Sequence, residues 1–154
     1  MALPRQILVP TDFSETAALA LDYAMELAAK VGAMVHVLHC YSFPILPVDA
    51  PYPYAADKLL KDMEAESLKK LAELVQEHGR LEVEVSVSAR LGDARSGIQH
   101  TIEAVGADLV CMGTHGRRGL SHLLLGSVAE YTVRASNVPT LAVHAPPSIP
   151  ARPE

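Results

Sequence analysis

The chain has 154 residues, 49% of them hydrophobic and 20% charged, which is typical of a single folded domain and excludes a disordered chain. Thirteen basic against eighteen acidic residues give a net charge of −5, which argues against a broad nucleic-acid-binding face. The sequence lacks the apolar run of about 18 residues that a membrane span needs, and its first residues do not lead one to expect a signal peptide. Since Cys40 and Cys111 are the only cysteines and are both predicted to be reduced, the protein is expected to be cytoplasmic.

Apolar spacing and turn residues predict a strand and then a helix at the start of the chain. The apolar strand over 6–9 stops at Pro10. Ser14 is expected to cap a helix over 15–31, and Gly32 is expected to terminate it.

The rest of the chain continues this alternation. A strand over 34–39 precedes a loop over 41–54 with four prolines, which is long for a connection inside a domain. The later predicted elements are a helix over 55–78, a strand over 81–88, a helix over 94–105, a strand over 109–112, a helix over 127–136 and a strand over 139–143. One domain over 1–145 is therefore expected, followed by a proline-rich tail over 146–154.

Strands that alternate with helices predict a parallel sheet with right-handed crossovers and helices on both faces. The strict alternation over 81–88 indicates an edge strand, and the continuous apolar run over 109–112 indicates a central one. In such sheets ligands bind beyond the carboxyl ends of the strands, where the strand order reverses. If the first and fourth strands are neighbours, the crevice lies between segment 10–12 and the loop at Gly113.

A glycine-rich segment joins the 109–112 strand to the 127–136 helix. Gly113 and Gly116 can adopt positive φ and let a ligand approach the backbone, so their amides and those of the two residues between them are candidate phosphate donors. Gly126 and Ser127 open the helix, whose positive end favours an anion. The alternative is a tight turn that happens to be rich in glycine.

Three charged residues border this crevice. Arg117 and Arg118 are candidates for neutralising a phosphate, or are simply solvated. Asp12 is a candidate acceptor for ribose hydroxyls or base N–H groups, or it caps the turn before the first helix.

Three segments resemble the universal stress protein family. They are Ile7-Leu-Val-Pro-Thr-Asp-Phe-Ser14, the Gly-x2-Gly-x9-Gly-Ser pattern that begins at Gly113, and Asn137-Val-Pro-Thr-Leu-Ala-Val143. The resemblance implies a Rossmann-like, adenine nucleotide alpha hydrolase-like α/β fold with a five-stranded parallel sheet in the order 3-2-1-4-5. It also implies membership of the ATP-binding branch, with Mg²⁺ possible beside the nucleotide.

The resemblance implies roles for particular residues. Adenine and ribose are expected near Pro10, Thr11, Asp12 and Cys40, and ribose and phosphates near Met112, Gly113, His115, Gly116, Arg117, Gly126, Ser127 and Val128. At Cys40 the family pattern leads one to expect an aliphatic residue. The resemblance further implies a homodimer through the strand at 139–144, where Leu141 and Val143 form a short apolar edge.

These observations favour an ATP-binding, regulatory stress-response module. Two alternatives stay open, a slow ATP hydrolase or nucleotidyl-handling enzyme on the same scaffold and a dimeric interaction protein that binds no nucleotide. The sequence has no Gly-x-Ser-x-Gly elbow, no Walker A lysine and neither a Cys-x2-Cys nor a His-Glu-x-x-His motif. No catalytic residue and no protein metal site is therefore predicted.

Overall fold

The computed structural model describes residues 2–45, 49, 54–115 and 125–146. In chain order the elements are β1 (Gln6–Pro10), α1 (Glu15–Val31), β2 (Met34–Tyr41), α2 (Tyr54–His78), β3 (Val85–Leu91), α3 (Ala94–Val105), β4 (Leu109–Gly113), α4 (Ser127–Ala135) and β5 (Thr140–Val143). The strands form one parallel sheet in the order β3-β2-β1-β4-β5, so the predicted topology is confirmed. Within the described ranges no helix combines the length and apolarity that crossing a bilayer requires.

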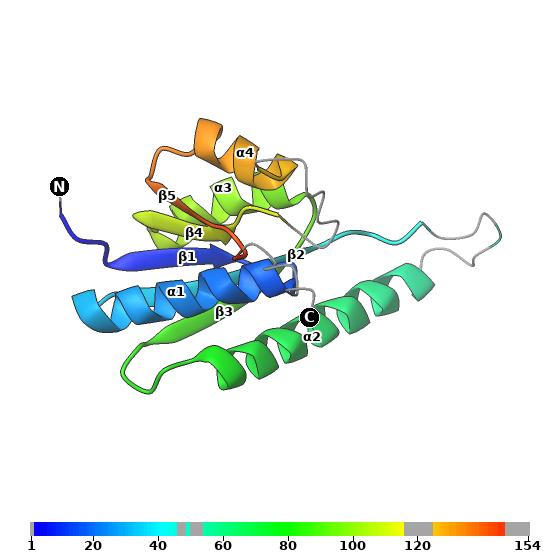
Figure 1. The fold of residues 1–154 in the computed structure, drawn as a ribbon. Coiled ribbons are helices and arrows are strands. Elements are labelled where there is room, and N and C mark those ends of the chain that lie inside the picture. The colour runs from blue at the N-terminus through cyan, green and yellow to red at the C-terminus, as the bar shows by residue number, and fades with distance from the viewer. Residues whose placement is uncertain (1, 46–48, 50–53, 116–124, 147–154) are drawn as a thin grey trace, which may run out of the picture.

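Helices cover both faces of the sheet, with α1 and α2 on one side and α3 and α4 on the other (Figure 1). On the first face the fully buried Leu21, Met25 and Leu71 pack against the apolar side chains of β1 and β2. On the second face Ile98 and Ala129 pack against the alternate residues of the central strands. Each large side chain removed from water in this way contributes about 1.5–3 kcal/mol, so both faces carry a core.

The first helix begins and ends where its sequence predicts. The Ser14 hydroxyl accepts a hydrogen bond from the Ala17 amide at 3.2 Å. Gly32 has φ of 75°, a left-handed conformation that glycine adopts without steric cost, and its amide donates to the Ala28 carbonyl. These caps fix where the chain leaves β1 and where it enters β2.

The predicted bounds of the third strand, 81–88, are wrong. The strand runs over Val85–Leu91, and Leu81 is fully exposed. Alternation alone does not make a strand, because its backbone needs a partner. Pairing with β2 begins at Val35 with Val85 and continues to Tyr41 with Leu91, so both strands end later than predicted.

A buried histidine lies between two serines of the edge strand. His36 Nδ1 is 2.7 Å from Ser86 Oγ, and its Nε2 is 2.8 Å from Ser88 Oγ. Burial lowers the pKa of His36 from its ordinary value, because the charged ring is poorly solvated there.

This burial predicts a loss of stability in mild acid. The unfolded chain takes up the proton near pH 6.5, whereas the folded chain takes it up only at lower pH. The contribution of His36 is therefore present above about pH 6.5 and is lost as the pH falls through the lowered folded-state pKa. Urea unfolding at about pH 7.5 and pH 5.5 measures this loss, which should be smaller in His36→Gln. An equal loss in both proteins would contradict the assignment.

Candidate functional site

The β1–α1 turn lies at the point where β1 leaves the sheet, and hydrogen bonds hold it on several sides. The Thr11 amide donates to the Leu38 carbonyl at 2.8 Å. Thr11 Oγ1 accepts from the Phe13 amide at 3.0 Å, and Asp12 Oδ1 accepts from the Ser14 amide at 3.0 Å. Among described residues other than glycine, Phe13 alone has a positive φ, 63°. Such backbone costs of the order of 1–3 kcal/mol, and this strain is often found at functional sites.

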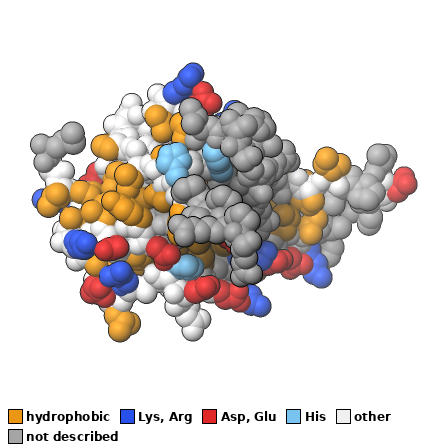
Figure 2. All heavy atoms as spheres, in the orientation of Figure 1, with side chains coloured by type: hydrophobic (Ala, Val, Ile, Leu, Met, Phe, Trp, Pro, Cys, Tyr) orange, Lys and Arg blue, Asp and Glu red, His pale blue; other side chains and the backbone are white. Residues whose placement is uncertain are grey.

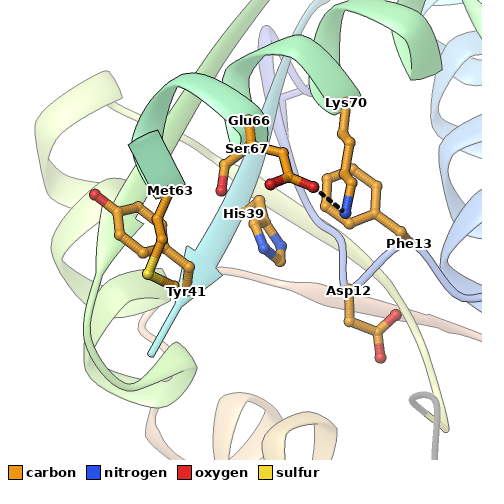
Figure 3. A pocket seen from close by; sticks show the side chains of 8 residues that line it. All are labelled: Asp12, Phe13, His39, Tyr41, Met63, Glu66, Ser67 and Lys70. Carbon is orange, nitrogen blue, oxygen red and sulfur yellow. Dashed lines mark ion pairs between the residues drawn. The ribbon is translucent and has the colours of Figure 1, made fainter. Parts of the chain in front are cut away.

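Asp12 therefore has the local capping role that the sequence left open. Its hydrogen bond to Ser14 fixes the direction of the carboxylate, which points away from Phe13 and His39 (Figure 3). A carboxylate has two oxygens and several lone pairs, so a capping role does not by itself exclude contact with a ligand.

At Cys40 the main chain, rather than the thiol, is directed toward the end of β1. The thiol faces α3, where a Cβ placed on Gly97 would lie 2.5 Å from the sulfur, and burial raises its pKa. Residues two apart on a strand point their main-chain groups to the same side. Since the Leu38 carbonyl accepts from Thr11, the N–H and C=O of Cys40 are directed past Pro10, where β1 ends. The side chain at this position therefore matters less than the resemblance suggests.

Gly113 is needed for close packing. A Cβ at this position would lie 2.9 Å from Thr16 Cγ2, 3.0 Å from the Thr16 carbonyl carbon and 3.1 Å from the Ala17 amide nitrogen. The described glycines with positive φ are Gly32, Gly92 and Gly106. The expectation that Gly113 supplies positive φ is therefore wrong, and this glycine instead lets the first turn of α1 pack directly against the end of β4.

Two of the amides near the predicted phosphate site are used by the protein itself. The Thr114 amide donates to the Val143 carbonyl at 3.0 Å, and the Gly126 amide donates to the Thr114 carbonyl. These bonds tie the end of β4 to β5 and to the start of α4. The expectation that both amides face a phosphate is therefore wrong.

The α4 helix begins at Ser127, as predicted. Gly126 is the N-cap and makes no side-chain cap, and its carbonyl accepts the first helical bond from Glu130. The amides of Ser127 and Val128 belong to the first turn, whose N–H groups have no carbonyl partner inside the helix. These amides, the Ser127 hydroxyl and the positive helix end can together hold a phosphate.

One more predicted contact lies beside this helix start. His115 Nδ1 is buried and has no hydrogen-bond partner among the described residues. A buried polar atom of this kind fits a site that is completed by a ligand or by another segment. Gly116 and Arg117, also predicted to bind the nucleotide, lie outside the described residues.

A pocket of about 300 Å³ lies between the β1–α1 turn, the end of β2 and α2. It is lined by Asp12, Phe13, His39, Tyr41, Met63, Glu66, Ser67 and Lys70 (Figure 3). Lys70 pairs with Glu66 at 3.2 Å, and its ammonium lies 6.0 Å from the centre of the Phe13 ring. Of these residues, sequence reasoning selected only Asp12 for a site. Ser67, a polar residue that is buried on α2, is the signal that could have marked this pocket.

A parallel α/β sheet in this order, whose strand order reverses between β1 and β4, defines a protein with a Rossmann-like fold. Residues 4–144 match the model of the universal stress protein family, and the chain belongs to that family. Universal stress protein MJ0531 of Methanocaldococcus jannaschii is 32% identical over 147 residues, which cover 94% of this chain and 84% of the relative.

Solved structures agree with this assignment. Hypothetical protein MJ0577 of the same organism has a TM-score of 0.80 at 29% identity, with 96% of this chain and 100% of the other covered. A universal stress protein crystallised in complex with cAMP has a TM-score of 0.64 at 24% identity, with 94% of this chain and 100% of the other covered. The likeness to the cAMP-bound protein shows that the two chains share a fold.

Proposed function

We propose that this protein binds an adenine nucleotide, ATP in the first instance, in the crevice between the β1–α1 turn and the start of α4. The observation that carries the proposal is the first turn of α4, where the N-cap Gly126 supplies no side-chain cap and which follows a strand at the reversal of strand order. Asp12 and the main chain of Cys40 receive the ribose and the base, and Mg²⁺ accompanies the phosphates. Binding acts as a regulatory signal in a stress response.

Two further observations support an adenine nucleotide over another anion. A universal stress protein with this fold has been solved with cAMP bound. In this chain the backbone of Cys40 extends past the end of β1, where it can pair with the polar edge of a planar base. The crevice therefore offers partners for both ends of a nucleotide.

The first test uses the purified, unmodified protein. Mass spectrometry of small molecules released on denaturation is expected to detect an adenine nucleotide. Added ATP at about 100 times its dissociation constant should raise the free energy of unfolding by about 2.7 kcal/mol. Parallel titrations with ADP, AMP and cAMP rank the ligands, and phosphate release measures turnover. No thermal shift with any of the four would refute nucleotide binding.

We further propose a homodimer formed by the 139–144 strand. β5 is an edge strand, and hydrophobic side chains gather on the surface over β5 and the neighbouring α1 (Figure 2). On α1, Tyr23 is 52% exposed. An unpaired strand edge beside an apolar surface favours pairing with a second copy of the chain.

An Ala142→Pro variant is expected to convert this dimer to a monomer. The carbonyls of Pro139 and Val143 accept bonds from β4, so the N–H of Ala142 is directed to the open edge. Proline removes that donor and leaves the β4–β5 ladder intact. Sedimentation velocity measures the change, and Leu141→Pro, which breaks the ladder itself, is the matched control for misfolding. A folded Ala142→Pro dimer would exclude this interface.

A further inference from the structure

One histidine of β2 reaches across to the backbone of the β1–α1 turn. His39 Nδ1 lies 2.8 Å from the Thr11 carbonyl oxygen. A carbonyl oxygen only accepts, so Nδ1 carries the hydrogen and donates it. The neighbouring bond from the Thr11 amide to the Leu38 carbonyl completes a two-point link between the turn and β2.

The same imidazole also packs against the strained residue of the turn. The rings of Phe13 and His39 are 4.5 Å apart at an angle of 47°. Phe13 has a φ of 63°, which a bulky side chain rarely adopts unless its surroundings hold it there. His39 therefore contacts the turn at two points, through a hydrogen bond to the Thr11 carbonyl and through a ring contact with Phe13.

We propose that His39 is a positioning residue for nucleotide binding, which it promotes by holding the β1–α1 turn in the conformation that directs Asp12 toward the ligand. This inference rests on the nucleotide-binding function proposed above. His39 lies on the α2 side with the pocket residues, whereas the Asp12 carboxylate points away from it (Figure 3). His39 thus acts through the turn, and its effect on affinity comes from pre-organisation.

The test compares variants by affinity for ATP and by amide exchange. His39→Leu removes the donor and the ring, and is expected to weaken ATP binding about tenfold, or about 1.4 kcal/mol. His39→Asn keeps an N–H donor near the same position and should bind within about threefold of the unmodified protein. His36→Leu is the matched control, because it removes another histidine of the same strand, one that is buried beside β3, and its affinity for ATP should be unchanged.

Hydrogen exchange gives a readout that needs no nucleotide. In the unmodified protein the amides of Phe13 and Ser14 donate hydrogen bonds within the turn. In His39→Leu these two amides should exchange faster than in the unmodified protein. The amides of β4 should keep their protection. If the unmodified protein binds no nucleotide, the proposed function fails, and unchanged exchange at the turn separately overturns the positioning role.

The remaining outcomes also decide the question. The proposal would be overturned if folded His39→Leu bound ATP as tightly as the unmodified protein. It would also be overturned if His39→Leu and His36→Leu lost equal amounts of ATP affinity. If His39→Leu does not fold, Phe13→Leu carries the same test, because it removes the ring contact and leaves the histidine in place. Faster exchange at Ser14 with weaker ATP binding supports the proposal, and no change in either measurement overturns it.

Discussion

A Gly113→Val substitution is expected to lower the free energy of unfolding by about 2–3 kcal/mol, the upper part of the range for overpacked contacts. The added side chain meets backbone as well as the Thr16 methyl group, since the Thr16 carbonyl carbon is 3.0 Å from the new Cβ. The first turn of α1 would have to move away from β4. Urea unfolding monitored by circular dichroism measures the loss as a lower midpoint at unchanged slope.

A smaller substitution and a second site refine this expectation. Gly113→Ala should cost less than Gly113→Val, and Thr16→Ser should relieve only part of the cost, because the backbone contacts remain. If the urea midpoint of Gly113→Val equalled that of the unmodified protein, the first turn of α1 would be able to move away from β4 without a loss of stability. Full relief by Thr16→Ser would assign the whole effect to one methyl group.

A Gly126→Asp substitution is expected to weaken ATP binding at least about 100-fold while the fold stays as stable as before. Aspartate is among the best N-cap residues, so α4 itself should be unharmed or strengthened. Its charge, however, lies where a phosphate is proposed to bind. Two like charges about 4 Å apart repel by about 4 kcal/mol at an effective dielectric constant of about 20, which exceeds the 2.7 kcal/mol of a hundredfold loss.

Gly126→Asn separates charge from shape in this experiment. Asparagine caps a helix as well as aspartate does and has nearly the same size, but it carries no charge. Calorimetric titration should therefore find a much smaller loss of affinity for Asn than for Asp, and the difference should shrink at high salt. Equal affinities of the two variants would place the phosphates elsewhere.

Local patterns predicted the fold well. A capping serine, a terminating glycine and apolar periodicity identified α1 with its bounds, and the order of elements implied the sheet. The third strand was misplaced because alternation in the sequence extends to Leu81, whereas pairing partners on β2 begin only at Val35. Strand bounds depend on a partner far away in the sequence, which no local window contains.

The site was harder to predict than the fold for the same reason. The glycine pattern located the helix start at Gly126. It did not reveal that the amides of Thr114 and Gly126 donate hydrogen bonds to carbonyl groups of the protein itself. Nor did it distinguish the packing role of Gly113 from a conformational one. The pocket residues of α2 and the contact of His39 with Thr11 arise only when separate segments meet.

The burial of Cys111 and the partial burial of Cys40 have a chemical consequence. Burial raises the pKa of Cys111 to about 12, and the thiol of Cys40 is also harder to ionise than usual. Peroxides attack the thiolate, so near neutral pH both groups are slow to oxidise. Neither cysteine therefore has the easily ionised thiol that is typical of a redox-sensing cysteine.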